Sequence, residues 1–367
     1  MKSRLAILVV VVITVIALLV AGCAPKAEPA PAPTTAPTTA PTTAPAPTPA
    51  PEGETYEWRA QTLWDAGENV YVDFTNWCED VGKLSGGQLT IEPFPAGAIV
   101  SYDEAFDAVR QGMFEINGAS YASGKDIAFN NSVAPFVVYE SFLQQRAWYY
   151  RAGGKELLDE LYRQWDLQNL GIHGWGNESL VFKDAVDTIE EFEGLKIRAP
   201  AGDVAKLMER LGADVATIPG PDVYLALSTG VIDAADWGSP SMNMSKGFFE
   251  VANYFSLPGY HSSGRSSASI NAEAYDALPV DLQAILLTSF AKYDLDQTLT
   301  ATYEDAIAIA EMAKMGVYGI PGSPELVKKV RGILLDIYSE DAEAGTMSEK
   351  FFDSHVNFLT QIGLWEG

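Results

Sequence analysis

Three residues with chemistry suited to an anionic ligand stand at the ends of predicted strands. Arg198 ends one alternating run, and Asp236 and Trp237 end a later one. A guanidinium can donate two parallel, charge-assisted hydrogen bonds to a carboxylate. A carboxylate and a backbone carbonyl are hard oxygen ligands, which suit Na⁺ or Ca²⁺ better than zinc. If the two strands are parallel, the side chains of Arg198, Asp236 and Trp237 can reach one rim of the sheet, where they could contact a ligand or an ion.

Further residues are candidates for the wall of this site. Aromatic walls exclude water and so strengthen an ion pair inside a pocket. Each aromatic residue could equally well pack in the core, and that alternative stays open. The aromatic candidates are Trp64, Tyr121, Trp175 and Trp237, and the amide candidates for ligand contact are Asn177 and Asn243.

The sequence gives little support to catalysis. Its histidines, His173, His261 and His355, lack the spacing of a metal-binding motif, and no G-x-S-x-G sequence is present. We expect His261 to pack at a hinge. Cys78 lies in an apolar helical stripe and is predicted to belong to the core. These observations favour a binding protein over an enzyme.

The elements that would position these residues occur twice in the same order: strand, helix, strand, helix, strand. The first set covers 56–63, 69–84, 88–94, 102–110 and 114–119, and the second covers 195–198, 203–211, 214–218, 222–228 and 231–237. Helices of this length between strands imply right-handed crossovers and parallel sheets. Ligands bind at the carboxyl ends of such strands. We therefore expect an α/β chain of two lobes around a cleft, followed by long helices at 276–296, 300–314, 324–337 and 349–364.

The N-terminus predicts export. Lys2 and Arg4 precede an apolar run at 5–20, and small residues then lead to Cys23. This arrangement is typical of a lipoprotein signal peptide, although a retained membrane anchor is an alternative. Residues 24–54 are almost entirely Ala, Pro and Thr, which favours an extended stalk. We expect an extracytoplasmic protein attached to the membrane through a lipid on Cys23.

The charge of the chain constrains its partners. Its formal charge is -25, and removal of Lys2 and Arg4 with the signal peptide would take it to -27. So acidic a chain is not expected to bind nucleic acid or a membrane surface through a basic patch. An anion site must therefore supply its own local positive charge. Cys78 alone would remain after lipidation, so no intramolecular disulfide is expected.

A set of short motifs resembles one transport family. The motifs are DAVRQG at 107–112, GLKIRAP at 194–200, LGA at 211–213, PG at 219–220, YLAL at 224–227, GVID at 230–233, DW at 236–237 and LPGYH at 257–261. In this order they resemble the solute-binding proteins of TRAP (tripartite ATP-independent periplasmic) transporters, the DctP-like family. The resemblance covers residues 57–365 and is nearest to the subgroup that binds 2-oxo monocarboxylates such as pyruvate.

The resemblance implies roles for several residues. The arginine of the GLKIR motif, here Arg198, pairs with the ligand carboxylate. The acidic residue before tryptophan, here Asp236 before Trp237, helps to hold Na⁺ or Ca²⁺, which the 2-oxo acid completes. The subgroup usually has Glu at the position of Asp236. Asn177 is the nearest amide to a glutamine that the subgroup usually carries, and it is a further candidate ligand of the ion. The implied partners are the TRAP permease subunits, and some relatives dimerise through C-terminal helices.

These observations together predict a two-lobed periplasmic-binding-protein (Venus flytrap) architecture. The expected parts are a signal peptide at 1–22, a lipidated cysteine and stalk at 23–54, lobe I at 55–178 with about 260–300 returning to it, lobe II at 179–259, and C-terminal helices at 300–367. The expected function is delivery of a small organic acid to a membrane permease, without a catalytic cofactor. The alternative is a ligand-sensing domain or an anchored enzyme that acts on a small carboxylate.

Overall fold

The computed structural model describes residues 53–365, except 121–124, 134–138 and 140. The chain divides into two units, 1–51 and 52–367, and the following account concerns the second. The predicted signal peptide, Cys23, nearly all of the stalk and Tyr121 lie outside the described residues. Within the described part of the chain, no helix is both long enough and apolar enough to cross a membrane.

The first lobe has the predicted strand and helix order. Its parallel strands are β1 (Tyr56–Gln61), β2 (Leu89–Phe94) and β3 (Ile116–Ser120). The intervening helices are α2 (Asn69–Leu84), a short 3-10 turn at Tyr102–Glu104 and α3 (Ala105–Arg110). Its core includes Phe74, Trp77 and Cys78, which is only 2% exposed, so the prediction of a core cysteine is confirmed.

The second lobe repeats this order. Its parallel strands are β5 (Lys196–Arg198), β6 (Asp214–Ala216) and β7 (Ala234–Gly238), and its helices are α7 (Asp203–Arg210), α8 (Val223–Thr229) and α9 (Pro240–Ser245). A 3-10 turn at Gly220–Asp222 precedes α8, and another at Phe248–Glu250 follows α9. A separate apolar cluster, which includes Val223, Leu227 and Phe249, forms part of its core.

Two long antiparallel strands join the lobes. They are β4 (Leu167–Phe182) and β9 (Ser262–Asn271), which pair along most of their length. β9 also pairs with β3, and β4 pairs with β7, so the strand order is β2-β1-β3-β9-β4-β7-β5-β6. β8 (Tyr254–Ser256) pairs with β4 and with β10 (Tyr318–Ile320). The expected boundary between 178 and 179 therefore falls inside β4.

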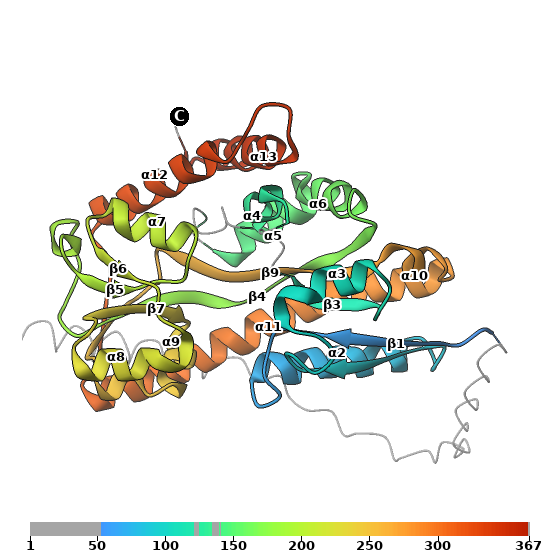
Figure 1. Ribbon diagram of the computed structural model, residues 1–367, viewed down its shortest axis with the longest axis horizontal. Coiled ribbons are helices and arrows are strands. Elements are labelled where there is room, and N and C mark those ends of the chain that lie inside the picture. Colours follow the sequence, from blue (N-terminus) through green and yellow to red (C-terminus); the bar gives the residue numbers. More distant parts are fainter. Residues whose placement is uncertain (1–52, 121–124, 134–138, 140, 366–367) are drawn as a thin grey trace, which may run out of the picture. The chain divides into compact units, whose positions relative to one another are not determined.

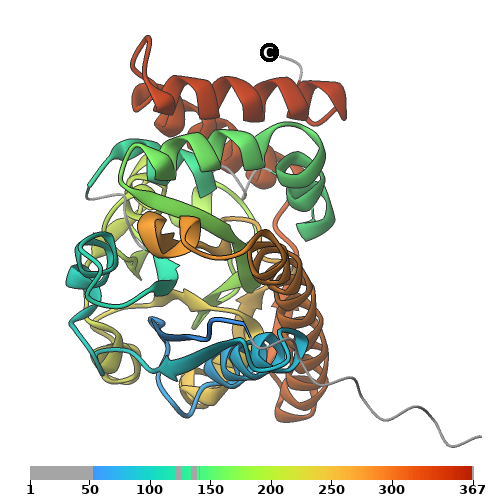
Figure 2. The ribbon, with the colours of Figure 1, turned by 90° about the vertical axis from the view of Figure 1, so that its right-hand side faces the viewer.

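Helices cover both faces of this sheet (Figure 1). One layer contains α4 (Ile127–Val133), α5 (Phe142–Arg151), α6 (Gly154–Arg163), α12 (Pro324–Glu340) and α13 (Met347–Gln361). In Figure 2 the red C-terminal helices lie directly above the green helices of this layer. α11 (Val280–Met315), which follows the short α10 (Ala272–Asp276), runs past both lobes as one helix of 36 residues. The expected break before residue 300 was wrong.

Candidate functional site

A cavity of about 390 Å³ lies where the two lobes meet the crossing strands. Side chains from β4, β5, β7 and β9 line it, together with residues of α4, α7, α9 and α12. Arg198, Asp236 and Trp237 all belong to its lining, at the carboxyl ends of parallel β5 and β7. The structure thus brings together the three residues that the sequence singled out.

Backbone carbonyls from two neighbouring segments hold Arg198. Its Nε donates to the carbonyl of Ile218 at 3.1 Å, and its Nη1 donates to the carbonyl of Asp236 at 2.5 Å. Its guanidinium carbon lies 5.3 Å from the centre of the Trp237 ring, within cation–π range. The side chain is half-buried, and burial lowers the pKa of Arg198 while nearby Asp236 and Glu178 oppose that shift. The guanidinium is therefore held in one orientation at the cavity wall.

Two acids and a histidine meet beside Arg198. The Oδ1 atom of Asp236 and the Nε2 atom of His261 lie 2.6 Å apart, and both side chains are almost fully buried. A carboxylate oxygen of Glu178 completes the group, with the three ligand atoms within 4.8 Å of one another. All three residues line the cavity. His261, which was expected to pack at a hinge, directly precedes the crossing strand β9 and lines the cavity, and Glu178 was not predicted at all.

Tryptophans form part of the wall. Trp64 and Trp175 both line the cavity, and their rings meet edge to face at 4.8 Å between centres. The indole of Trp237 lies against the backbone of Gly220, where an added Cβ would stand 2.1 Å from Cη2 of the ring. The close contact requires glycine at that position, because any larger residue would push the indole away. Three of the four aromatic candidates thus reach the cavity, and Tyr121 lies outside the described residues.

The two asparagines take other places. Asn243 is fully buried, and its Nδ2 donates to the carbonyls of Ser179 and Gly238, both at 2.9 Å. These bonds tie β4 to the end of β7, and Asn243 is not among the described residues that line the cavity. Glu178 lines the cavity, whereas its neighbour Asn177 is not among the described residues that do so. Successive side chains of a strand point to opposite faces, which explains this difference.

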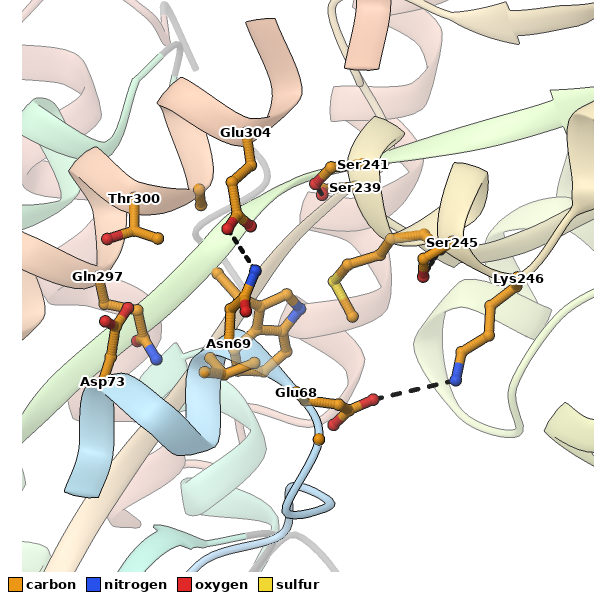
Figure 3. A pocket seen from close by; sticks show the side chains of 15 residues that line it. Glu68, Asn69, Asp73, Ser239, Ser241, Ser245, Lys246, Gln297, Thr300 and Glu304 are labelled. Carbon is orange, nitrogen blue, oxygen red and sulfur yellow. Dashed lines mark hydrogen bonds and ion pairs between the residues drawn. The ribbon is translucent and has the colours of Figure 1, made fainter. Parts of the chain in front are cut away.

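A second cavity, of about 420 Å³, adjoins the first (Figure 3). The two share Glu68, Trp175 and Met242. Glu68 pairs with Lys246 at 3.9 Å, and Asn69 hydrogen bonds to Glu304 of α11. These contacts link the first lobe to the end of α9 and to α11.

The sequence also missed a cluster of buried charges. Arg265 of β9 lines the first cavity, and its Nη1 lies 3.5 Å from Oδ1 of Asp294 on α11. Arg146 of α5 contacts the same carboxylate. Nothing local in the serine-rich run around Arg265 marks it as a site residue, since its position depends on the pairing of β9 with β4.

Comparisons with known proteins agree on one family. Residues 60–343 match the family described as "Bacterial extracellular solute-binding protein, family 7". A monocarboxylate 2-oxoacid-binding periplasmic protein of Nostoc is 29% identical over 316 residues, which are 84% of this chain and 85% of that protein. The chain covers nearly the full length of this relative.

Solved structures show the same likeness. An apo, open TRAP periplasmic solute-binding protein from Rhodobacter sphaeroides superposes with a TM-score of 0.75 and 32% identity, over 84% of this chain and 99% of that one. A TRAP protein from Pseudoalteromonas atlantica with bound sodium and pyruvate has a TM-score of 0.70 and 26% identity, over 85% and 96%. A TRAP protein from Colwellia psychrerythraea with bound calcium and pyruvate has a TM-score of 0.72 and 25% identity, over 85% of this chain and 96% of that one.

Proposed function

This chain belongs to the bacterial extracellular solute-binding proteins of family 7, and from that membership we propose that its cavity captures a small 2-oxo acid such as pyruvate. As a TRAP solute-binding protein it works with membrane permease subunits. The observation that carries the ligand proposal is the meeting of Arg198 with Glu178 and Asp236 in one interlobe cavity. Arg198 would bind the carboxylate, and an ion held by the two acids would bind the 2-oxo oxygen.

The acid pair itself is the reason to include an ion. Glu178 and Asp236 place two carboxylates beside a site for an anion, and like charges at this range repel strongly. A cation between the acids and the ligand removes that conflict. Glu178, Asp236 and the Trp237 carbonyl offer the oxygen ligands that Na⁺ or Ca²⁺ prefers. His261 fits as the group that orients Asp236, because second-shell hydrogen bonds fix the geometry of metal ligands.

Isothermal titration of protein stripped of ligand tests this proposal. We expect pyruvate to bind more tightly than propanoate, which has the carboxylate but lacks the 2-oxo group. Failure of every 2-oxo acid to bind, with the fold intact, would overturn it. Recovery of unchanged pyruvate by NMR after long incubation checks the further proposal that the protein does not act as an enzyme.

We also propose that a lipid on Cys23 attaches this extracytoplasmic protein to the membrane. The supporting observation is the run of small residues directly before that cysteine. Replacement Cys23→Ser should release the protein from the membrane fraction in cells that otherwise retain it. Continued retention of the variant would contradict the anchor.

We also propose that the protein forms a homodimer, and the supporting observation is a row of exposed residues on α11. Leu295, Leu299, Tyr303 and Ile307 are 44%, 58%, 68% and 47% exposed and recur every fourth residue. Such an uncharged ridge can pack against the same ridge of a second copy at about -50°. A two-fold dimer needs a self-complementary surface of this kind. Light scattering should show a dimer that Tyr303→Glu dissociates, and a monomeric wild type would contradict it.

A further inference from the structure

A β-bulge in β7 carries two residues of the proposed site. The register of the pairing between β7 and β4 shifts between Ser179 and Val181 of β4. At this place two residues of β7, Asp236 and Trp237, lie opposite one residue of β4. Such bulges are common beside functional sites, where the extra residue changes the direction of a side chain.

Side chains from two helices hold the segment that follows the bulge. Asn243 of α9 donates to the carbonyl of Gly238 at 2.9 Å. Asp305 of α11 holds the next residue, because its Oδ1 atom accepts from the hydroxyl of Ser239 at 2.8 Å. The same oxygen accepts from the backbone N–H of Ser241 at 2.9 Å, so Asp305 also satisfies one of the N–H groups at the start of α9.

The other oxygen of Asp305 lies close to β4. A Cβ added to Gly176 would stand 3.3 Å from Oδ2 of Asp305 and 3.3 Å from Cβ of Ser239. Gly176 has a φ of 112°, which favours glycine, and it lies two residues before Glu178. One carboxylate therefore lies against both segments that carry the acids of the proposed ion site, Glu178 in β4 and Asp236 in β7.

An ion site at a bulge needs support of this kind. A bulge interrupts the regular hydrogen bonds of the strand pair, so the backbone alone holds Asp236 and the carbonyl of Trp237 less firmly than a regular strand would. Hydrogen bonds outside the ligand set then fix the orientation of the ligands, and their loss typically lowers metal affinity about 10- to 100-fold. The position of these oxygens thus depends on the residues that hold the end of the bulge.

We propose that Asp305 is a positioning residue of the ion site, which holds Ser239 and so fixes the oxygens of Asp236 and Trp237 toward the ion. This inference rests on the proposed function, because that function includes the ion. Neither Asp305 nor Ser239 is among the described residues that line the first cavity, so Asp305 acts through the bulge and not on the ligand.

A purely structural role for Asp305 predicts a different result. If it only caps α9, its removal lowers thermal stability and leaves the ion requirement of pyruvate binding unchanged. If it positions the ion ligands, its removal raises the ion concentration that pyruvate binding needs, and excess ion restores most of the affinity. The dependence of pyruvate affinity on the ion therefore separates the two roles.

The test is titration of ligand-stripped wild type and variants with pyruvate over a range of Na⁺ and of Ca²⁺ concentrations. In Asp305→Ala, the ion concentration at which pyruvate affinity is half of its maximum should rise about tenfold or more, with affinity within about threefold of wild type at saturating ion. Asp305→Asn keeps an oxygen that can accept both hydrogen bonds, so its ion requirement should rise by less than about threefold.

Thr346→Ala is the matched control. Thr346 caps α13 by accepting from the N–H of Glu349 at 3.3 Å, and none of the described residues of α13 lines the first cavity. Its loss should lower stability and leave the ion requirement at the wild-type value. Thermal melting verifies the fold of each variant. If Asp305→Ala does not fold, Ser239→Ala takes its place, because it removes the same hydrogen bond and should raise the ion requirement at least about threefold.

The outcomes distinguish this inference from the proposed function. A wild-type ion requirement in Asp305→Ala, or in Ser239→Ala where that variant replaces it, overturns the positioning role and leaves the proposed function standing. An equal loss of affinity at limiting and saturating ion, or equal ion requirements in Asp305→Ala and Asp305→Asn, also overturns it. If the wild type binds pyruvate equally well without either ion, the inference and the proposed ion are overturned, and capture of the acid still stands. Failure of every 2-oxo acid to bind the wild type overturns the proposed function as well.

Discussion

At the scale of single residues, Arg198 has two of its nitrogens fixed by backbone carbonyls before any ligand arrives. This preorganisation lowers the entropic cost of binding, and a lysine ammonium could not reproduce the planar fork. We expect Arg198→Lys and Arg198→Ala to bind the ligand at least about 30-fold more weakly, since truncation of such a pair costs about 2–5 kcal/mol. Isothermal titration measures this, with Arg210→Lys at an exposed ion pair as the control. Affinities within about threefold of wild type would exclude the clamp.

A second residue-scale prediction concerns the ion beside Asp236. Removal of Na⁺ and Ca²⁺ should weaken ligand binding, because Glu178 and Asp236 then repel the incoming carboxylate. Restoring one of the two ions should recover the affinity. Asp236→Asn removes one of the charges, so its ligand affinity should depend less on the ion than that of the wild type. Titration in sodium-free, chelator-treated buffer checks both statements, and an unchanged wild-type affinity there would show that no ion is needed.

The cavity residues that were predicted from the sequence differ in one physical respect from those that were not. Arg198 and Asp236 end short parallel strands, where the rule for ligand sites in open sheets applies. Glu178, His261 and Arg265 reach the cavity from the long antiparallel strand pair or the segment just before it. The sequence gives no signal for that pairing, so their convergence could not be predicted.

At the scale of elements, the helices and strands of the lobes could be predicted from the sequence, whereas the segments that join the lobes could not. The repeated strands and helices were predictable from periodicity and stop signals. The strand β4 was not predicted from the sequence, because 14 of its 16 residues are buried and it therefore lacks the alternation that marks a half-exposed strand. α11 was divided wrongly although it contains no glycine or proline, since its weak periodicity was read as two helices.

The packing of α13 on α5 leads to a prediction about pH. His355 of α13 is fully buried, stacks on Trp148 at 3.8 Å between ring centres, and hydrogen bonds to the Tyr139 hydroxyl at 3.0 Å. Burial lowers the pKa of His355 from its ordinary value of 6.5 to about 3. Below about pH 6.5 the unfolded chain gains a proton there that the folded chain does not, so acid should lower stability by up to about 1.4 kcal/mol per pH unit.

Replacement His355→Phe keeps an aromatic ring at this position and removes the titration. Urea denaturation between pH 6.5 and 5 should show a shallower loss of stability for the variant than for the wild type. Burial also lowers the pKa of His173, so a residual slope of the same sign should remain. Equal slopes for both proteins would show that His355 does not control this dependence.

At the scale of the whole folded unit, side chains of the two lobes touch across the cleft. Asn130 of α4 donates to Asp203 of α7 at 2.6 Å, with both residues on the lining of the first cavity. Glu68 and Lys246 meet at the junction of the two cavities. We expect such contacts to stabilise a closed arrangement of the lobes whether or not a ligand is bound. They also set how much of the closed state exists before binding.

Lys246 allows a test of this closure at a residue outside the proposed ligand contacts, and its amine also lies 5.8 Å from the centre of the Trp237 ring. Lys246→Gln removes the ion pair with Glu68, which is partly exposed and therefore contributes only about 0.2–1 kcal/mol. The closed population of the ligand-free protein should fall, and the apparent affinity should fall with it by up to about fivefold. Small-angle scattering should show a larger radius for the ligand-free variant and the same compact radius for both proteins at saturation. Lys292→Gln, which removes an exposed pair with Asp296 within α11 and a longer one with Asp80 of α2, serves as the control. If the radius of the wild type does not change at saturating ligand, closure itself is contradicted. If Lys246→Gln binds the ligand as tightly as the wild type does, only the contribution of this ion pair to closure is contradicted.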